Sequence, residues 1–494
     1  MRYLSVLLII QVLLIGCAKK ISHADEKVDW IHQVDSLIMP FFMNEDAIGN
    51  PPGNFPAYRY SNGTPVDPAS IDYTRLNPDF TPFFLNETDS LRRSYLRTNS
   101  RQIYGYCIAY HMTGNETYLL RAKQGLDYLI QRNAFQNGSA VSFWDQDGSP
   151  QPTIFARNTQ DLAYALLGPA AYYYLTRDAN VLNLILENHQ FAWDHYFENS
   201  SISDKSKLMM WVKEDFEKDS TGHKELVAPL DHLNAYMLLM ARIVPDSLKG
   251  TFLSRSKELA YSIKDNFYNP ELNLFWGNLN WKRLGYHTDF AHSIKTFWML
   301  YTTSQFTNDS ELRQFANTGA SKLLETAFIE DQNRWASNFL DENGTLNTGI
   351  GTWEFCELDQ MAATLSFNNA TYYEKYLSKT YTYYDRVHID RANGNTHLFT
   401  DESGKPIDLG IKTGWHISNF HILEHALIGY LSTLNYSQKP MTLYYAFQNE
   451  LTIADSEIQP YHYSADILKK EESKFANSQF EQMNKVKVTF SNIR

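Results

Sequence analysis

Residues 412–430 read KTGWHISNFHILEHALIGY, and this stretch decides how the rest of the chain is interpreted. It holds three histidines, His416, His421 and His425, and one carboxylate, Glu424. Apolar residues then recur at helical spacing, which predicts a loop that leads into a buried helix. Imidazoles exchange protons near neutral pH because their ordinary pKa lies there, so this stretch is a candidate site for proton transfer.

A second stretch, residues 285–301, reads GYHTDFAHSIKTFWMLY and repeats this design with His287, His292 and Trp298. Its apolar residues again follow the period of a buried helix, and Trp298 is interpreted as a core residue. We expect the two helices to face each other across a pocket of the size of a sugar.

The chain begins MRYLSVLLIIQVLLIGCAKK, in which one arginine precedes a short apolar run. The run is shorter than the roughly 20 residues that span a bilayer and is typical of a secretory signal segment. Its end, Leu-Ile-Gly-Cys, resembles the bacterial lipobox. We expect residues 1–16 to be a lipoprotein signal peptide, Cys17 to carry lipid, and residues 17–26 to form a tether. This predicts an anchored protein of the bacterial cell envelope, facing the periplasm or the surface; a transmembrane anchor and an ordinary signal peptide are the alternatives.

The composition narrows the class of partner. A net charge of -12 without basic runs argues against nucleic acid and against anionic membrane surfaces, so the membrane is expected to be a partner only through the lipid anchor. Aromatic residues make up 14% of the chain, and their rings stack on sugar C–H surfaces, which suits a mono- or oligosaccharide partner. Cys107 and Cys356 are too few for a disulfide framework or a zinc site, and no cofactor is expected.

The middle of the chain predicts a helical domain over residues 27–435. Helical periodicity covers residues 27–43 (ending near Pro40), 100–113, 115–133, 159–176, 179–198, 230–243, 248–267, 290–306, 310–328, 353–366, 370–384 and 416–434. Paired helices of this kind predict an all-α fold, an (α/α)6 toroid whose inner helices line a central pocket. A helical solenoid is the alternative, although no repeat of fixed length is visible.

The remaining segments complete this architecture. Residues 139–150, 273–285 and 392–406 carry turn signals and predict hairpins on the rim of the barrel. Residues 44–82 form a long segment rich in Gly, Pro, Asn and Tyr, which we expect to be an ordered lid. Residues 436–494 contain alternating stretches that predict a small β-rich C-terminal appendage.

Several motifs then occur in a characteristic order. Residues 101–110 read RQIYGYCIAY, residues 291–300 read AHSIKTFWML, and Trp353, Glu357 and residues 415–421 follow. Together they resemble the N-acylglucosamine 2-epimerase superfamily over residues 28–434. The resemblance implies an (α/α)6 barrel enzyme related to cellobiose 2-epimerases and to aldose–ketose isomerases of mannose or sulfoquinovose.

The chain departs from the family pattern at three positions. Lys295 stands where the family has a glutamate three residues after the middle histidine. Asp231 and Asn234 stand where the family has a histidine and a glutamate in the preceding inner helix. The chain therefore resembles a distinct branch of the superfamily.

Epimerisation at C2 of an aldose removes a weakly acidic proton beside a carbonyl and returns a proton to the other face. We predict that His292 and His421 are the base and the acid, and that Arg101 holds the enediolate oxygen. Aldose–ketose isomerisation needs the same base but returns the proton to C1. The predicted substrate-binding residues are Trp353, Glu357, Asp231, Asn234, Trp415, His416 and Tyr104.

Four alternatives stay open. The histidines and tryptophans could be structural core residues. Residues 421–425 match H-x-x-E-H, an inverted zinc-protease motif. A glycoside hydrolase of the same fold would use carboxylates, for which Asp161, Asp231, Asp289 and Glu357 are candidates. A sugar-binding lipoprotein would have kept the fold and lost catalysis.

Overall fold

The computed structural model describes residues 28–78, 91, 93–151, 157–197, 224–341 and 343–494. The predicted signal peptide and Cys17 lie outside these residues, so the lipid anchor stays a prediction. Within the described ranges, no helix combines the length and the apolar composition that crossing a membrane requires.

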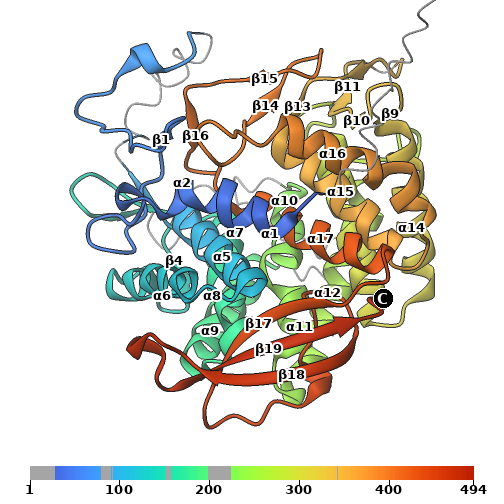
Figure 1. The fold of residues 1–494 in the computed structure, drawn as a ribbon. Helices are drawn as coiled ribbons and strands as arrows, with labels where there is room; N and C mark the ends of the chain where they lie inside the picture. The colour runs from blue at the N-terminus through green and yellow to red at the C-terminus, as the bar shows by residue number, and fades with distance from the viewer. Residues whose placement is uncertain (1–27, 79–90, 92, 152–156, 198–223, 342) are drawn as a thin grey trace, which may run out of the picture.

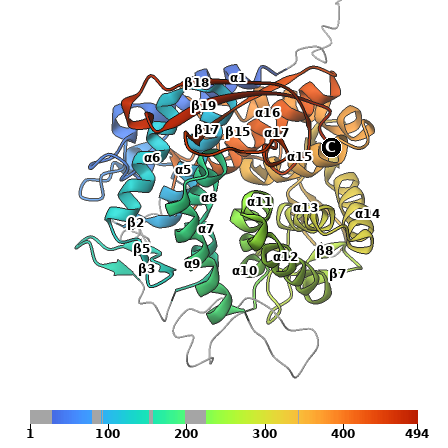
Figure 2. The ribbon, with the colours of Figure 1, turned by 90° about the horizontal axis from the view of Figure 1, so that it is seen from below.

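Helices dominate the structure, as the sequence predicts. One set is almost wholly buried: α5 (Leu96–Thr113), α7 (Thr159–Ala165), α8 (Leu167–Thr176), α10 (Val227–His232), α11 (Leu238–Ile243), α13 (Phe290–Phe306), α15 (Thr352–Ser366) and α17 (Phe420–Tyr436). A second set buries one face only: α6 (Glu116–Gln131), α9 (Ala179–Tyr196), α12 (Asp246–Phe267), α14 (Ser310–Ala327) and α16 (Ser378–Val387). Figure 2 shows α6, α9, α12 and α14 lying outside α5, α8, α11 and α13.

The buried helices contact one another around the centre of the molecule. Helix α5 packs against α8 and α17, and α15 packs against α13 and α17. A helix that is apolar on all sides belongs in a core, but α5 also buries Asn99, Arg101 and Gln102. Buried polar side chains are costly unless they have partners, so such residues are candidates for a functional role.

Capping residues mark where the helices begin. Asn115, Asp178, Asp289 and Asp309 each accept a backbone N–H at the start of α6, α9, α13 and α14, respectively. A short polar side chain at this position satisfies an N–H that has no partner within the helix. Among them, Asp289 fixes the first turn of α13, where His292 lies.

The opening helix continues past Pro40, which corrects the expected end. Helix α1 (Trp30–His32) leads into a π-helical segment (Gln33–Ile38) and then into α2 (Met39–Met43). Pro40 lies in the first turn of α2, where a missing N–H costs little. The Trp30 indole donates to Thr433 Oγ1 at 3.1 Å, and Gly429 lets the ring approach α17, since a Cβ there would lie 2.3 Å from it.

Short strand pairs connect the helices. The pairs are β3 (Phe135–Gln136) with β4 (Ser139–Ala140), β5 (Phe143–Trp144) with β2 (Ser94–Tyr95) and β6 (Pro150–Gln151), β7 (Tyr268–Asn269) with β8 (Leu274–Phe275), β9 (Phe328–Ile329) with β10 (Arg334–Trp335), β11 (Asn338–Phe339) with β12 (Leu346–Asn347), and β14 (Phe399–Thr400) with β13 (Ile350–Gly351) and β15 (Pro406–Ile407). In the expected lid, β1 (Arg59–Tyr60) pairs with β16 (Ile411–Thr413), and Tyr58 and Tyr60 are buried. Figure 1 shows β13, β14, β15 and β16 on one side of the helices. The described part of this segment therefore packs on the rim.

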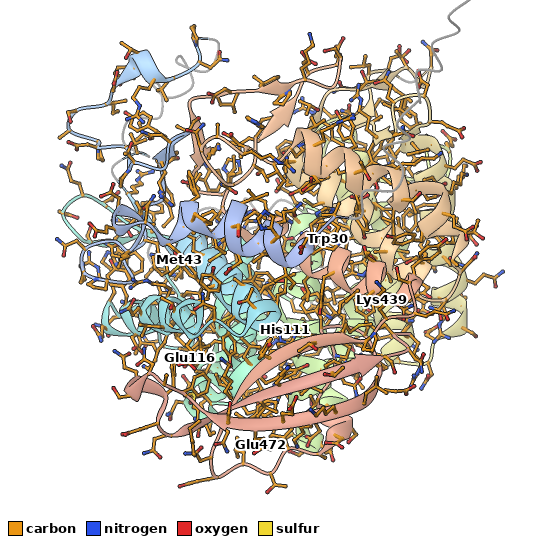
Figure 3. The ribbon with its side chains drawn as sticks, viewed as in Figure 1. Trp30, Met43, His111, Glu116, Lys439 and Glu472 are labelled. Carbon is orange, nitrogen blue, oxygen red and sulfur yellow. The ribbon has the colours of Figure 1, made fainter. Side chains whose placement is uncertain are left out.

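The C-terminal strands form one antiparallel sheet in the order β17 (Met441–Gln448), β19 (Met483–Ser491), β18 (Asp466–Lys474). In Figure 1 the sheet lies at the opposite side of the helices from β13–β16. His111 Nδ1 lies 2.8 Å from the Tyr444 carbonyl oxygen, and Glu116 accepts the backbone N–H groups of Ala476 and Asn477 (Figure 3). The sheet is thus fastened to α5 and α6 and shares their core.

Candidate active site

A cavity of about 310 Å³ is lined by residues of six buried helices, α5, α7, α10, α13, α15 and α17, and this volume suits a small-molecule site. Its charged and titratable lining residues are Arg97, Arg101, Tyr164, Asp231, His287, Asp289, His292, Lys295, His416 and His421. Trp353, Leu398, Phe399, Ile417 and Ile422 supply apolar surface. The two histidine-containing stretches of the sequence, more than 100 residues apart, therefore meet at one cavity.

His292 is held by the residue that caps its helix. Asp289 Oδ1 accepts the backbone N–H of His292 at 2.7 Å, and Asp289 Oδ2 lies 2.7 Å from His292 Nδ1. Burial acts to lower the pKa of His292, but the Asp289 carboxylate outweighs it, so the pKa is raised above its ordinary value. His292 therefore favours the protonated form more than a free histidine does.

The pKa of His421 is shifted in the opposite direction from that of His292. Burial lowers its pKa to about 4, although Glu357 favours the charged form. His421 Nδ1 lies 3.2 Å from Glu357 Oε1, but the two atoms are not aligned for a hydrogen bond. His421 is therefore a neutral imidazole near neutral pH.

Trp353 lies close to both of these histidines. Its ring centroid is 4.9 Å from that of His292 and 5.8 Å from that of His421. All three rings line the cavity, so one imidazole from α13 and one from α17 form part of its wall.

Lys295 and Asp231, two of the departures from the family pattern, bind each other. Lys295 Nζ lies 2.9 Å from Asp231 Oδ1, and both side chains are almost wholly buried. Gln160 and Tyr164 also donate to the Asp231 carboxylate, at 2.8 and 3.1 Å. Burial works against the charge on each partner, but the opposite charge prevails: the pKa of Asp231 is lowered and that of Lys295 is raised. Both groups are therefore charged.

Arg101 lies at the same cavity. One of its Nη atoms donates to the carbonyl of His416, and the guanidinium stacks over Tyr164, 4.1 Å from the ring centroid. Burial lowers the Arg101 pKa to about 10, so the group keeps its charge at neutral pH. Burial lowers the pKa of His416 to about 3, which makes it a neutral residue of the cavity wall.

Four predicted substrate-binding residues are absent from the cavity lining: Glu357, Asn234, Trp415 and Tyr104. Glu357 lies behind His421 and Lys295. Trp415 packs against Tyr95 and Tyr58 in a separate hydrophobic cluster on the rim, and Asn234 is buried within a π-helical turn, Leu233–Met237.

Tyr104 is separated from the cavity for a reason that the sequence does not show. Its hydroxyl lies 2.8 Å from the hydroxyl of Tyr461, which also donates to Glu424 Oε1. Tyr461 comes from the loop between β17 and β18, so the C-terminal segment fills the space beside Tyr104. Burial, together with Glu357, raises the pKa of Glu424 to about 8.

The H-x-x-E-H motif of residues 421–425 does not converge on a common point. His425 Nε2 lies 2.8 Å from Asp359 Oδ2, while Glu424 is engaged by Tyr461 and His421 contacts Glu357. Among the described residues, no three His, Cys, Asp or Glu side chains are grouped to hold a metal ion.

Four residues line the cavity that the sequence does not predict for the site: His287, Arg97, Tyr164 and Gln160. For His287 a signal existed, because it precedes His292 by five residues in a glycine-containing turn. For Arg97 and Tyr164, helical spacing relative to Arg101 and Asp161 was the available signal, and Gln160 lies one helical turn before Tyr164.

Known proteins are similar to this chain in structure but not in sequence. No family model matches the sequence, and no curated protein matches it. A D-mannose isomerase superimposes with a TM-score of 0.64 and 18% identity, over 82% of this chain and 96% of that chain. A cellobiose 2-epimerase from Spirochaeta thermophila gives 0.64 and 15%, over 82% and 95%.

A hydrolase shares the architecture more distantly. An α-1,6-mannanase (GH76A) from Salegentibacter superimposes with a TM-score of 0.51 and 15% identity, over 81% of this chain and 98% of that chain. At these identities the likenesses show the fold alone. They are consistent with the helical toroid that the sequence predicts.

Proposed function

We propose that this protein is a carbohydrate epimerase or isomerase that moves a proton beside the carbonyl of an aldose. The observation that carries the proposal is that His292 and His421, from α13 and α17, both lie next to Trp353 at one cavity. Known epimerases and isomerases of similar fold support the reaction class.

The two histidines have complementary protonation. The pKa of His292 is raised and that of His421 is lowered to about 4, so one favours the acid form and the other is a base. Two groups whose pKa values are pushed apart by their surroundings suit an acid and a base. In one direction of the reaction, His421 removes the proton from C2, and the histidine group on the α13 side, which includes His292, returns a proton to carbon. In the reverse direction the two roles are exchanged.

The enediolate that forms between these steps needs positive charge near its oxygens. We assign this role to Arg101 and add Lys295, because both cations line the cavity. Lys295 is held in place by Asp231 and Arg101 by the His416 carbonyl, so neither needs to reorganise during the reaction. Trp353 presents a ring face on which the sugar can stack.

The proposal also covers the closure of the barrel and the location of the protein in the cell. We infer that the helices form a closed (α/α)6 barrel, which the packing of α5 between α8 and α17 supports. We also infer that Cys17 anchors the protein in the bacterial cell envelope, which the lipobox-like sequence supports.

A hydrolase is disfavoured by the state of the carboxylates. A glycosidase needs a protonated acid at the scissile bond, which requires a raised pKa. Of the candidate carboxylates, Asp231 and Asp289 have lowered pKa values, and Asp161 lies 3.9 Å from Arg97. Glu424 and Glu354, whose pKa values are raised, do not line the cavity.

The test is NMR of sugars incubated with the protein in heavy water, with mannose, glucose, N-acetylated hexosamines and β-linked disaccharides. Deuterium at a sugar carbon is expected, and it should be lost in both His292→Asn and His421→Asn. A new reducing end without deuterium would indicate the hydrolase. Binding without either product would indicate a protein that has lost catalysis.

A further inference from the structure

Three titratable side chains form a linear chain at the α13 side of the cavity. Asp289 Oδ2 lies 2.7 Å from His292 Nδ1, and His292 Nε2 lies 3.0 Å from His287 Nδ1. Both nitrogens of His292 are therefore occupied, so His292 has no ring nitrogen left for a substrate. His287 lines the same cavity, and its Nε2 is the one ring nitrogen of the pair that neither Asp289 nor the other imidazole uses.

The hydrogen-bond chemistry sets the order of protons along this chain. The Asp289 carboxylate accepts, so His292 carries its proton on Nδ1. When His292 is neutral, its Nε2 accepts, and His287 must donate from Nδ1. His287 Nε2 is then an unprotonated base at the cavity.

The backbone is built to present His287 in this position. Gly285, Tyr286 and His287 all have positive φ, at 72°, 42° and 63°, in a turn closed by backbone hydrogen bonds between Gly285 and Thr288. Positive φ is unusual for a residue with a side chain and is retained where the surroundings enforce it. Here Tyr286 donates to Glu225 Oε1 at 2.9 Å, and a Cβ on Gly277 would lie 1.9 Å from the Tyr286 carbonyl oxygen.

We propose that His287 is the residue that exchanges a proton with the sugar carbon on this side, and that His292 and Asp289 form a relay behind it. This inference rests on the proposed epimerase or isomerase function. In deprotonation, the C–H bond breaks and its proton joins His287 Nε2, while the electron pair forms the enediolate. The Nδ1 proton of His287 passes to His292 Nε2, and Asp289 stabilises the resulting imidazolium. Return of a proton to carbon reverses each transfer.

Charged groups from four helices surround the relay, and Arg97 from α5 acts on His287. Lys295 lies one turn further along α13, Asp231 faces it from α10, and Glu354 approaches from the first turn of α15. Lys295 and Asp231 are paired with each other, so Asp289 is the anion that acts on the relay directly. Positive charge that enters the relay from the cavity is therefore stabilised at its far end, by Asp289.

The protonation order can be measured without any substrate. Nitrogen-15 NMR of the full chain, labelled in histidine and recorded at pH 9, should show protonated Nδ1 and unprotonated Nε2 in both His287 and His292. The signals are assigned by their loss in His287→Asn and His292→Asn. A proton on His287 Nε2 under these conditions overturns the proposal.

Kinetics test the role of His287 itself. His287→Asn keeps the turn, because asparagine tolerates positive φ, and should slow deuterium incorporation roughly 100-fold or more, with a smaller change in KM. His195→Asn, on the exposed face of the outer helix α9, is the matched control and should react at the wild-type rate. A His287→Asn protein within threefold of wild type overturns the proposal.

Failure of the proposed function is distinguishable from failure of the relay. If wild-type protein exchanges no deuterium into any sugar, the proposed function falls, and with it the role given to His287. If wild type exchanges and only His292→Asn is inactive, the function stands and the relay falls.

Discussion

Lys295 Nζ and Asp231 Oδ1 lie 2.9 Å apart, and both side chains are buried. The two residues are 64 positions apart in the sequence and belong to different helices, α13 and α10. Both residues depart from the pattern of the superfamily that the sequence resembles, and they do so together. A lysine or an aspartate alone would be an unpaired charge in a buried site, which is strongly unfavourable. The two departures therefore compensate each other in charge, and they place an ion pair at the cavity.

The first prediction concerns this pair. Lys295→Met and Asp231→Leu should each destabilise the protein by roughly 3–5 kcal/mol, because each leaves the partner charge buried. The double variant should lose much less than the sum of the two. Chemical denaturation of the four proteins gives the coupling energy, and additive effects would contradict a direct pair.

The second prediction concerns Asp289. Asp289→Asn keeps the capping function at α13 but removes the charge that holds the His292 Nδ1 proton. We expect the melting temperature to stay near that of wild type and the deuterium-exchange rate to fall by roughly 10²–10⁴-fold. Asp289→Ala is the comparison, since it loses the cap as well and should also melt earlier. Wild-type exchange in Asp289→Asn would exclude a role for this carboxylate in proton transfer.

The third prediction concerns the pH dependence of stability. Burial raises the pKa of Glu424 to about 8 from an ordinary value of 4.5, so between these values the folded state holds a proton that the unfolded state releases. Its contribution to stability is thus fully present below pH 4.5 and is lost as the pH rises to 8. Glu424→Gln removes this loss. Its melting temperature should match wild type near pH 4.5 and exceed it increasingly toward pH 8.5; a difference independent of pH would refute the shifted pKa.

The fourth prediction concerns Tyr461 in the C-terminal segment. Tyr461→Phe removes a hydroxyl that contacts both Glu424 and Tyr104 in the core. Leaving these buried groups without a partner should cost about 1–3 kcal/mol, measured by denaturation. Tyr436→Phe is a matched control, because its hydroxyl bonds an exposed glutamate, Glu374, and its loss should have little effect. Equal effects of the two changes would argue against a buried role for Tyr461.

The fifth prediction concerns Arg101. Lysine cannot reproduce a planar guanidinium that stacks on Tyr164 while one N–H binds the His416 carbonyl. Arg101→Lys should therefore lower kcat/KM by roughly tenfold or more, and Arg101→Met should lower it further. Steady-state kinetics on the sugar identified by NMR provide the measurement. A fully active Arg101→Lys would show that charge alone is required there.

Much of the fold was predictable because helices carry a local signal. The period of apolar residues located α5, α13 and α15 within a few positions. The sequence predicts that the last helix begins at residue 416, whereas α17 begins at Phe420. The error has a physical cause: His416 belongs to a loop that turns toward Arg101, and periodicity does not separate such a loop from the helix that follows.

The site was predictable only in part. His292, His421 and Arg101 were selected from motifs, and they do line one cavity. Tyr104 was selected in the same way, yet Tyr461, 357 residues away, occupies the space beside it. The sequence places His287 five residues before His292, but only the folded turn brings the two rings into contact.

The sequence by itself determined which segments are helical, which helices are buried, and which residue types carry the chemistry. Only the tertiary structure decided the partners: Asp231 for Lys295, Tyr461 for Glu424, and Trp353 for both His292 and His421. The reason is that periodicity depends on the few residues of one turn and reports only which face is buried. The neighbour that this face meets is set by packing between segments far apart in the chain, and the same contacts decide the charge of each site residue.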